Sequence, residues 1–396
     1  MSADRTVAIW RSAMLGGSET FVRNQGSALT RWSPVYVGAT KVESPQARDT
    51  DLIAFPSPAD RNAFLRLRLT GTSPRLRQLL AEVSPRLVHA HFGGDGWLVS
   101  GEAKRLGIPL IVTAHGHDVT RQPASSGAHG VRYRRNLRTV FARAAVIIAV
   151  SEVIRAKAVS WGADPAKVRV HHTGVTIPPA GPPAPQRWDV AFVGRFVPKK
   201  GTDDLVEALG MLADLRPRVV FLGDGPLAAA ARERAAALRL DATFLGMQDH
   251  AAVGRALAAT RVLAAPSRTA PDGDTEGLPT TILEAAARGV PVVSTRHSGI
   301  PEAVLHGETG LLGAEGDRAA LADHLRRLLT DEDLRQRLGR RARAHTAEHF
   351  DLHRQTGLME DLYDAISAGA AATGRREGPR GRRPRTPVRP GRHPGR

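Results

Sequence analysis

Short runs of apolar residues alternate along the chain with longer stretches in which apolar residues recur every three to four positions. The short runs have the length of buried β-strands, and the longer stretches have the spacing of amphipathic helices. The predicted strands are residues 7–10, 34–38, 87–91, 109–113, 146–150 and 167–171 in the first half, and 189–193, 219–222, 242–245, 262–265 and 290–294 in the second.

Helical patterns fill most of the intervals between these runs. The predicted helices are residues 18–32, 75–81, 132–143, 203–212, 227–238, 251–258, 279–288, 319–329, 331–348 and 352–368. Strands that alternate with helices predict parallel sheets with helices on both faces, so the fold class is α/β.

A proline-rich segment divides the alternating pattern into two halves. Residues 177–186 contain five prolines in ten positions, which excludes a helix or a central strand. We therefore predict two doubly wound, Rossmann-like domains, residues 1–177 and 187–350, joined by a linker at 178–186. Ligands of such sheets bind beyond the carboxyl ends of the strands, so the expected site is the cleft between the domains.

The composition narrows the class of protein. A chain of 396 residues is long enough for two domains, and the absence of cysteine excludes disulfides and thiolate chemistry. The N-terminus lacks the apolar core of a signal peptide. No apolar run approaches the roughly 18 residues of a transmembrane helix. We expect a cytoplasmic protein.

Positive charge is concentrated at the C-terminus. The formal net charge is +17, and residues 374–396 hold nine arginines and one glutamate. Residues 371–396 cannot bury a core and are predicted to be disordered. The rest of the chain is still basic, which favours phosphate-rich partners. A nucleic-acid-binding protein is one alternative, but the tail lacks interleaved aromatic residues, so we expect no nucleic acid.

Two glutamates flank the start of the predicted helix at Pro279. Glu276 precedes the helix, Glu284 lies about one turn inside it, and the N–H groups of Thr280 and Thr281 point out of the same end. Both glutamates could simply complement the helix dipole. Alternatively, hydroxyl groups of a sugar nucleotide bind the two carboxylates, and its phosphate binds the amides between them.

Basic and glycine residues follow two of the predicted strands. Arg195 ends the first strand of the second domain and Lys200 precedes the next helix, an arrangement that suits a diphosphate. Gly17 belongs to a glycine pair that opens the first helix of the first domain, where backbone can approach a phosphate. A solvated cation pair and a plain tight turn are the structural alternatives.

Histidines follow two strands of the first domain. In Thr113-Ala-His115-Gly-His117-Asp118, His115 can face a reacting sugar, and His117 and Asp118 can orient an acceptor hydroxyl. These could equally be loop residues without a role. Asp272 and Asp274 have the spacing of a metal-binding pair but lie in a loop, so we expect no metal.

These motifs, in this order, resemble the family 4 retaining glycosyltransferases of GT-B fold. The resemblance rests on Arg195…Lys200-Gly, GDGP, FLG, EGLPTTILEA and SGIPEAV…GETGLL in the second half. GGSETF, HAHFG and TAHGHD in the first half resemble the exopolysaccharide, colanic-acid-like branch. Two departures are Ser298-Gly299, where the family usually has two glycines, and the acidic insert Asp272-Gly-Asp274.

The resemblance implies a role for each candidate residue. Glu276 would bind the donor sugar near the reaction centre, with His115 lining it from the first domain; these are the two catalytic candidates. Glu284 would bind the nucleotide ribose, and the backbone of Met247 the base. The donor diphosphate would bind Arg195, Lys200, Gly17, Thr280 and Thr281. A last helix, residues 351–370, would cross back onto the first domain.

The implied reaction transfers a hexosyl group from a nucleotide diphosphate sugar to a hydroxyl acceptor, with retention and without a metal or other cofactor. The acceptor would be a glycan, a lipid-linked glycan or a small molecule such as a secondary metabolite. An epimerase of the same fold is an alternative of a different class.

Arginines interleaved with apolar residues in the first domain also suggest a peripheral contact with an anionic membrane. The arginines are Arg61, Arg66, Arg68, Arg75 and Arg77, and a further set is Arg132, Arg134, Arg135, Arg138 and Arg143.

Overall fold

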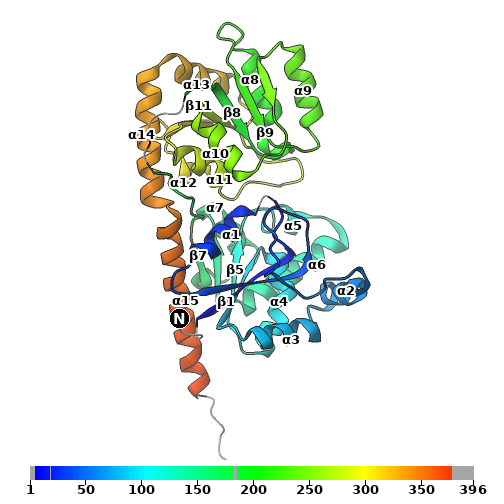
Figure 1. Ribbon diagram of the computed structural model, residues 1–396. Coiled ribbons are helices and arrows are strands. Elements are labelled where there is room, and N and C mark those ends of the chain that lie inside the picture. Colours follow the sequence, from blue (N-terminus) through cyan, green and yellow to red (C-terminus); the bar gives the residue numbers. More distant parts are fainter. Residues whose placement is uncertain (1–4, 18, 180, 182–184, 377–396) are drawn as a thin grey trace, which may run out of the picture.

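The computed structural model describes residues 5–17, 19–179, 181 and 185–376. These residues form two α/β domains, one above the other in Figure 1, each built on one parallel sheet. The predicted fold class is confirmed. Parts of the predicted linker 178–186 and the basic tail from residue 377 lie outside the described residues.

The sheet of the first domain has seven strands in the order β3-β2-β1-β4-β5-β6-β7, all paired in parallel. The strands are β1 Thr6–Met14, β2 Ser33–Lys41, β3 Leu52–Ile53, β4 Leu87–His91, β5 Leu110–Ala114, β6 Val146–Ala149 and β7 Val168–Val170. All five residues of β4 and of β5 are buried, because helices cover both faces of the sheet. Continuous apolar runs therefore marked these strands in the sequence.

The sheet of the second domain has six strands in the order β10-β9-β8-β11-β12-β13, also all parallel. The strands are β8 Trp188–Val193, β9 Val219–Leu222, β10 Ala242–Phe244, β11 Thr260–Ala265, β12 Val292–Thr295 and β13 Gly310–Gly313. The order reverses between β8 and β11, so the loops after these two strands open onto one crevice.

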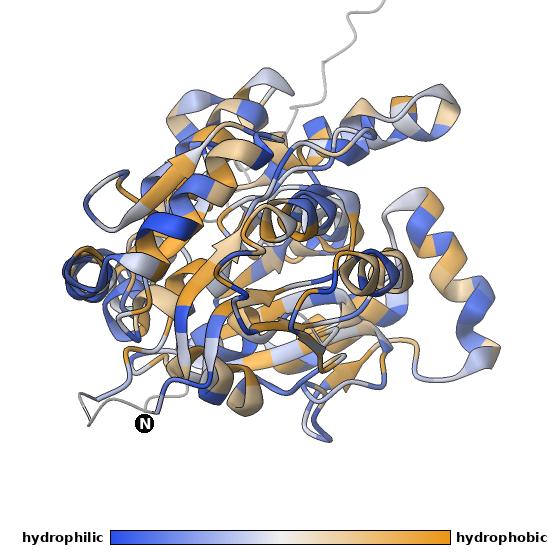
Figure 2. Cartoon of the chain, turned by 90° about the horizontal axis from the view of Figure 1, so that it is seen from above, coloured by the Kyte–Doolittle hydropathy of each residue, from blue (hydrophilic) through white to orange (hydrophobic). Residues whose placement is uncertain are grey.

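Helices flank both sheets and turn their polar faces outward (Figure 2). In the first domain they are α1 Thr20–Ser27, α2 Arg61–Thr70, α3 Pro74–Val83, α4 Gly93–Arg105, α5 Arg121–Ala124, α6 Gly127–Arg143 and α7 Glu152–Ser160. In the second they are α8 Thr202–Gly210, α9 Ala228–Ala237, α10 His250–Ala258, α11 Thr280–Ala286, α12 Ile300–Ala303, α13 Arg318–Thr330 and α14 Glu332–His349, followed by α15 Leu352–Arg376.

Three helix predictions need correction. The helix predicted at 18–32 ends at Ser27, and buried Trp32 leads directly into β2. Pro279 is the N-cap of α11 and not its first helical residue. The last helix extends to Arg376, past the predicted end at residue 370. Residues 371–376 are therefore helical in the structure.

Helix α4 was not predicted, because glycines at its start hide it. A Cβ atom on Gly93 would lie 2.5 Å from Cδ1 of Leu137, and one on Gly96 would lie 2.9 Å from Cγ1 of Val140. Leu137 and Val140 belong to α6, so these glycines allow α4 and α6 to pack closely. Close packing thus outweighs the low helix propensity of glycine here.

Helix α15 leaves the second domain and packs against the first, along the left side of Figure 1. Its buried Glu360 accepts hydrogen bonds from the backbone N–H groups of Thr30 at 2.8 Å, Arg31 at 2.6 Å and Trp32 at 3.1 Å. Burial alone would raise the pKa of Glu360, but these donors outweigh it and lower the pKa. The hydroxyl of Tyr363 adds a 2.6 Å hydrogen bond with Nδ1 of His89 in β4.

We expect Glu360→Ala to destabilise the protein by about 1–3 kcal/mol, because three backbone donors lose a charged acceptor. A lower midpoint in thermal unfolding would show this. Asp361→Ala is the matched control, since the side chain of Asp361 is 65% exposed and, among the described residues, its carboxylate pairs with the side chain of Arg31 alone. Equal midpoints for the two variants would contradict the role of Glu360 in fixing α15.

Candidate active site

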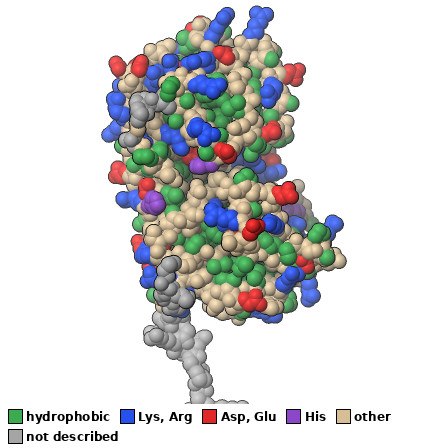
Figure 3. Space-filling view, viewed as in Figure 1, with side chains coloured by type: hydrophobic (Ala, Val, Ile, Leu, Met, Phe, Trp, Pro, Cys, Tyr) green, Lys and Arg blue, Asp and Glu red, His purple; other side chains and the backbone are tan. Residues whose placement is uncertain are grey.

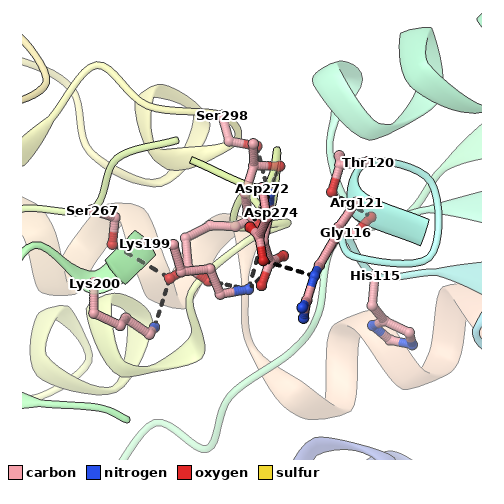
Figure 4. Close-up of polar contacts among 12 residues, drawn as sticks. His115, Gly116, Thr120, Arg121, Lys199, Lys200, Ser267, Asp272, Asp274 and Ser298 are labelled. Atoms are coloured by element: carbon pink, nitrogen blue, oxygen red, sulfur yellow. Dashed lines mark hydrogen bonds and ion pairs between the residues drawn. The ribbon is translucent and has the colours of Figure 1, made fainter. Parts of the chain in front are cut away.

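Glu276 and Lys200 form a buried ion pair at the carboxyl edge of the second sheet, between β8 and β11. Nζ of Lys200 lies 2.8 Å from Oε1 of Glu276, and only 7% of Glu276 is exposed. The side chain of Lys200 runs past Gly194, where an added Cβ would lie 3.3 Å from its Cε. Figure 4 shows Lys200 and Ser267 on the second-domain side of the cleft and His115 on the other.

The charge of Glu276 depends on two lysines. Burial opposes ionisation of this carboxyl, but Lys200, Lys199 and a hydrogen bond from Lys200 outweigh it and lower its pKa to about 2. Lys199 is itself buried, with Nζ 3.2 Å from Oδ1 of Asp274 and 4.0 Å from Oε2 of Glu276. Glu276 is therefore a carboxylate at physiological pH. Lys199 was not predicted as a site residue, because in the sequence it looks like one of two adjacent surface lysines.

Two residues after β12 hold the backbone of Glu276. Nε2 of the buried His297 accepts a 3.1 Å hydrogen bond from the Glu276 N–H, and Nδ1 of His297 lies 2.6 Å from Glu315. The hydroxyl of Ser298 donates to the carbonyl oxygen of Glu276 at 2.6 Å. Ser298 adopts φ 47°, a left-handed conformation that favours glycine. The departure from the glycine pair thus adds a hydrogen bond to the Glu276 backbone.

Backbone meets backbone where the two domains touch beside Glu276. A Cβ atom on Gly277 would lie 1.9 Å from the carbonyl oxygen of His115, and one on Gly116 would lie 3.1 Å from the Gly277 N. Gly116 also has φ 141°. Any side chain at Gly277 would push the domains apart, so this glycine sets the width of the cleft at Glu276.

The acidic insert contacts cations on both sides of the cleft. Asp274 pairs with Lys199, and Oδ2 of Asp272 lies 2.8 Å from Nε of Arg121, at the start of α5 in the first domain (Figure 4). Both partners of the Arg121–Asp272 pair are about half exposed, so the pair adds little stability. No group of three or more metal-binding side chains occurs within the described residues.

The other donor-side candidates lie on α11 and after β8. Glu284 lies inside α11, near His250, whose Nδ1 is 3.9 Å from Oε1 of Glu284. Burial raises the pKa of Glu284, against the opposing charges of His250 and Arg288. Thr280 and Thr281 form the first turn of α11. The exposed Arg195 forms no ion pair with a carboxylate of the described residues, so its charge is available to a ligand.

Met247 and Gly17 are also exposed. Met247 follows β10 and is 64% exposed, and the carbonyl of the preceding Gly246 accepts a hydrogen bond from Gly223 at 2.8 Å. Gly17 lies between β1 and α1, next to Gly16, whose N–H donates to Glu19 at 3.3 Å. Their assignments to base and diphosphate stay predictions.

The partly buried His115 continues a row of rings that begins with the buried His89 and His91. Its Nε2 lies 3.0 Å from Nδ1 of His91, and its ring centroid lies 4.5 Å from that of Phe92. Burial and the charge of Arg11 lower the pKa of His115 well below its usual value, so the ring is neutral. Phe92 has φ 69°, which places its ring between His115 and His117.

The carboxylate of Asp118 is bonded to backbone groups of its own domain. Its carboxylate accepts hydrogen bonds from the backbone N–H groups of His115 at 3.1 Å, Gly116 at 3.0 Å and Gly93 at 2.9 Å. The side chain therefore shapes the loop after β5. Asp118 also lines a cavity of the first domain, and its predicted role in orienting an acceptor hydroxyl stays a prediction. His117 is exposed and lines the same cavity.

Family models match both domains. The model described as Glycosyltransferase Family 4 matches residues 15–177, and the model described as Glycosyl transferases group 1 matches residues 176–345. The chain belongs to this glycosyltransferase family. The Glu276 site lies within the second match, and the His115 loop lies within the first. The chain is therefore a glycosyltransferase, and the alternative reading as an epimerase has no support from these matches.

Relatives and solved structures agree with the family. The amylovoran biosynthesis glycosyltransferase AmsK of Erwinia amylovora is 29% identical over 70% of this chain and 69% of its own length. WcaL of Salmonella typhimurium, named provisionally as a colanic acid biosynthesis glycosyltransferase, is 30% identical over 74% of each chain. The sucrose-phosphate synthase structure from Thermosynechococcus elongatus aligns with TM-score 0.74 at 20% identity, covering 92% of this chain and 100% of that one.

We expect Lys200→Ala to lower the rate of glycosyl transfer by about 100-fold, because a preorganised cation is lost from the site where charge develops. A transfer assay checks the rate, and circular dichroism checks that the variant is folded. Lys157→Ala is the control, since Lys157 is exposed on α7 of the other domain. Normal turnover in a folded Lys200→Ala variant would rule out the diphosphate role.

Proposed function

We propose that this glycosyltransferase moves a hexosyl group from a nucleotide diphosphate sugar to a hydroxyl of a glycan acceptor, with retention of configuration. The observation that supports this most is the buried Glu276–Lys200 pair, 2.8 Å apart, at the point where the two domains touch. The bond that breaks joins the donor sugar to its diphosphate. Glu276 would accept hydroxyls of the sugar on one side of this bond, and Lys200 would bind the phosphate on the other.

The proposed mechanism centres on charge stabilisation. When the bond between sugar and diphosphate breaks, negative charge develops on the leaving phosphate oxygen. Lys200 and Arg195 stabilise that charge, which lowers the barrier without a metal ion. Glu276 accepts hydroxyls of the donor sugar and holds it in place. The acceptor hydroxyl attacks from the same face as the leaving group, whose phosphate takes up the proton; the retained stereochemistry rests on membership of the family.

The donor is proposed from a structural neighbour and from the position of Glu284. The structure of HepE from Anabaena, described in complex with UDP-glucose, aligns with TM-score 0.72 at 17% identity over 91% of this chain and 99% of that one. We propose a UDP-sugar as the donor, with its ribose on Glu284. Since AmsK and WcaL are named for exopolysaccharide pathways, we propose exopolysaccharide biosynthesis as the setting.

We expect UDP to raise the thermal midpoint of the protein more than GDP or ADP does, because a ligand of the folded state stabilises that state. Glu284→Ala should then weaken UDP binding by about 1–3 kcal/mol, since a buried hydrogen-bond partner of the ribose is lost. Titration calorimetry measures this loss. Glu233→Ala, on an exposed position of α9, should bind UDP normally. Unchanged affinity in Glu284→Ala would contradict the ribose role.

We also propose a peripheral membrane contact through helix α2. Leu65 is 41% and Leu69 63% exposed on this helix, and Arg61 and Arg66 flank them. Helix α2 projects from the right side of the first domain in Figure 1. Within the described residues, no helix has the length and apolar character needed to span a bilayer. Four of the predicted basic residues contact groups within the domain. Arg75 pairs with Asp60, Arg77 pairs with Glu102, Arg134 donates to backbone carbonyls, and Arg143 donates to Ser100.

We expect the protein to co-sediment with anionic phospholipid vesicles at low salt and to be released at high salt, because exposed charge pairs are screened. The double variant Leu65→Ser, Leu69→Ser should bind at least several-fold less, since it loses the apolar contact. Met211→Ser removes an exposed apolar residue of the second domain and is the control. Equal sedimentation of both variants would contradict a membrane contact by α2.

A further inference from the structure

The first domain contains a cavity of about 430 Å³ that lies on the acceptor side of the proposed reaction centre. Its wall includes His117, one residue from Gly116, which contacts Gly277 of the second domain. Helices α2, α4, α5 and α6 and strands β1 and β2 also contribute to the wall, and α2, α4 and α6 lie at the lower right of Figure 1. The wall of the cavity therefore comes within one residue of the place where the two domains touch. The volume falls in the range of about 300–1,000 Å³ that is typical of small-molecule sites.

The charges on the floor of the cavity are already paired. Arg11 forms ion pairs with both Glu19 and Asp95. Asp95 also accepts hydrogen bonds from the Ser12 N–H at 2.6 Å and the Ser12 hydroxyl at 2.7 Å. Burial acts against the charge of Arg11, but these carboxylates outweigh it and raise its pKa. Because the floor groups are satisfied within the protein, they form a rigid base and leave little capacity to neutralise a charged ligand.

Two arginines at the rim of the cavity, unlike Arg11 on the floor, have no carboxylate partner among the described residues. Arg68 of α2 and Arg132 of α6 both line the cavity and are exposed. Neither forms an ion pair with a carboxylate among the described residues; the guanidinium of Arg68 lies 6.0 Å from the ring centroid of Phe64. Their charges are therefore unbalanced at the mouth of the cavity. Arginine binds phosphate and carboxylate groups with paired N–H donors, so this rim suits an anionic group.

Aromatic rings supply the surface between rim and floor. Phe64, Phe92, Trp97 and Tyr133 all line the cavity. Rings of this kind offer flat apolar faces, while Tyr133 is held in place by a 2.9 Å hydrogen bond from its hydroxyl to the carbonyl of Asp118. The cavity thus combines flat apolar faces for a sugar ring with positive charge at one end and the reaction centre at the other.

We propose that this cavity binds the acceptor, and that the acceptor carries a phosphate, diphosphate or carboxylate group that binds Arg68 and Arg132. The proposal rests on the proposed transferase function and specifies its acceptor class. The anionic group lies at the rim, and the hydroxyl that receives the hexose points past His117 toward Glu276. The anionic group belongs either to a soluble sugar phosphate or to the diphosphate of a lipid-linked sugar, which have the same charge chemistry at this rim.

The test uses the full chain saturated with UDP, so that the donor phosphate site is filled. Calorimetry then compares glucose with glucose 6-phosphate, and with a short-chain alkyl diphosphate glucose in neutral detergent micelles. We expect at least one anionic probe to bind at least tenfold more tightly than glucose. Arg68→Gln and Arg132→Gln should each weaken that probe about tenfold or more, while UDP affinity stays unchanged. Lys104→Gln, an exposed position on α4 with the same change in charge, should bind the probe normally.

The outcomes separate this proposal from the proposed function. UDP binding together with equal affinity for glucose and both anionic probes would overturn the anionic acceptor and leave the transferase function standing. Equal losses in Arg68→Gln, Arg132→Gln and Lys104→Gln would also overturn it, because they would reflect net charge alone. Failure of every nucleotide to bind would overturn both. Tighter binding of the soluble or of the micellar probe identifies the source of the anionic group.

Discussion

The ionised state of Glu276 is the constraint on which this site depends. Removing a carboxylate from water costs several kcal/mol, and that cost must be offset within the protein. Lys200 and Lys199 offset it, and they are aligned because the loop after β8 faces the loop after β11. Parallel pairing of β8 with β11 is therefore what brings the cations and the carboxylate together, since it places both loops at the same edge of the sheet.

A second constraint fixes the distance between the domains. Gly277 follows Glu276 directly, and its missing side chain allows the carbonyl of His115 to approach. Farther along the interface, Glu302 accepts a hydrogen bond from the Glu152 N–H at 2.9 Å and lies 2.9 Å from Nε2 of His172. Helix α15 adds the contact of Glu360 with residues 30–32. The donor carboxylate and the histidine loop are thus held opposite each other by contacts at three separate places.

Sequence reasoning found what periodicity and motif spacing encode. The buried strands were visible as apolar runs, and Glu276, Lys200 and His115 were visible as polar residues at strand ends. It missed α4, because glycines that permit close helix packing look like a loop. It also missed Lys199 and His297, whose roles depend on which way the chain turns after a strand; nothing in their local sequence distinguishes them from surface residues. The contacts of Asp118 with three backbone donors could not be predicted for the same reason, since they form only in the folded loop.

The two walls of the cleft use charge in different ways. On the second-domain wall, Lys200 and Glu276 pair with each other. The proposed donor would therefore replace one contact with others, its phosphate binding Lys200 and its hydroxyls binding Glu276. Such an exchange adds little to ground-state affinity, because the lysine is not left unpaired in the free protein. The gain comes when the sugar–phosphate bond breaks and the charge next to Lys200 grows, and stabilisation that appears only then is what accelerates a reaction. On the first-domain wall, the charges on the cavity floor are already paired, and those of the rim arginines Arg68 and Arg132 are not paired with a carboxylate of the described residues. In the proposed complex, charge on this wall therefore contributes to binding the acceptor and not to the chemical step.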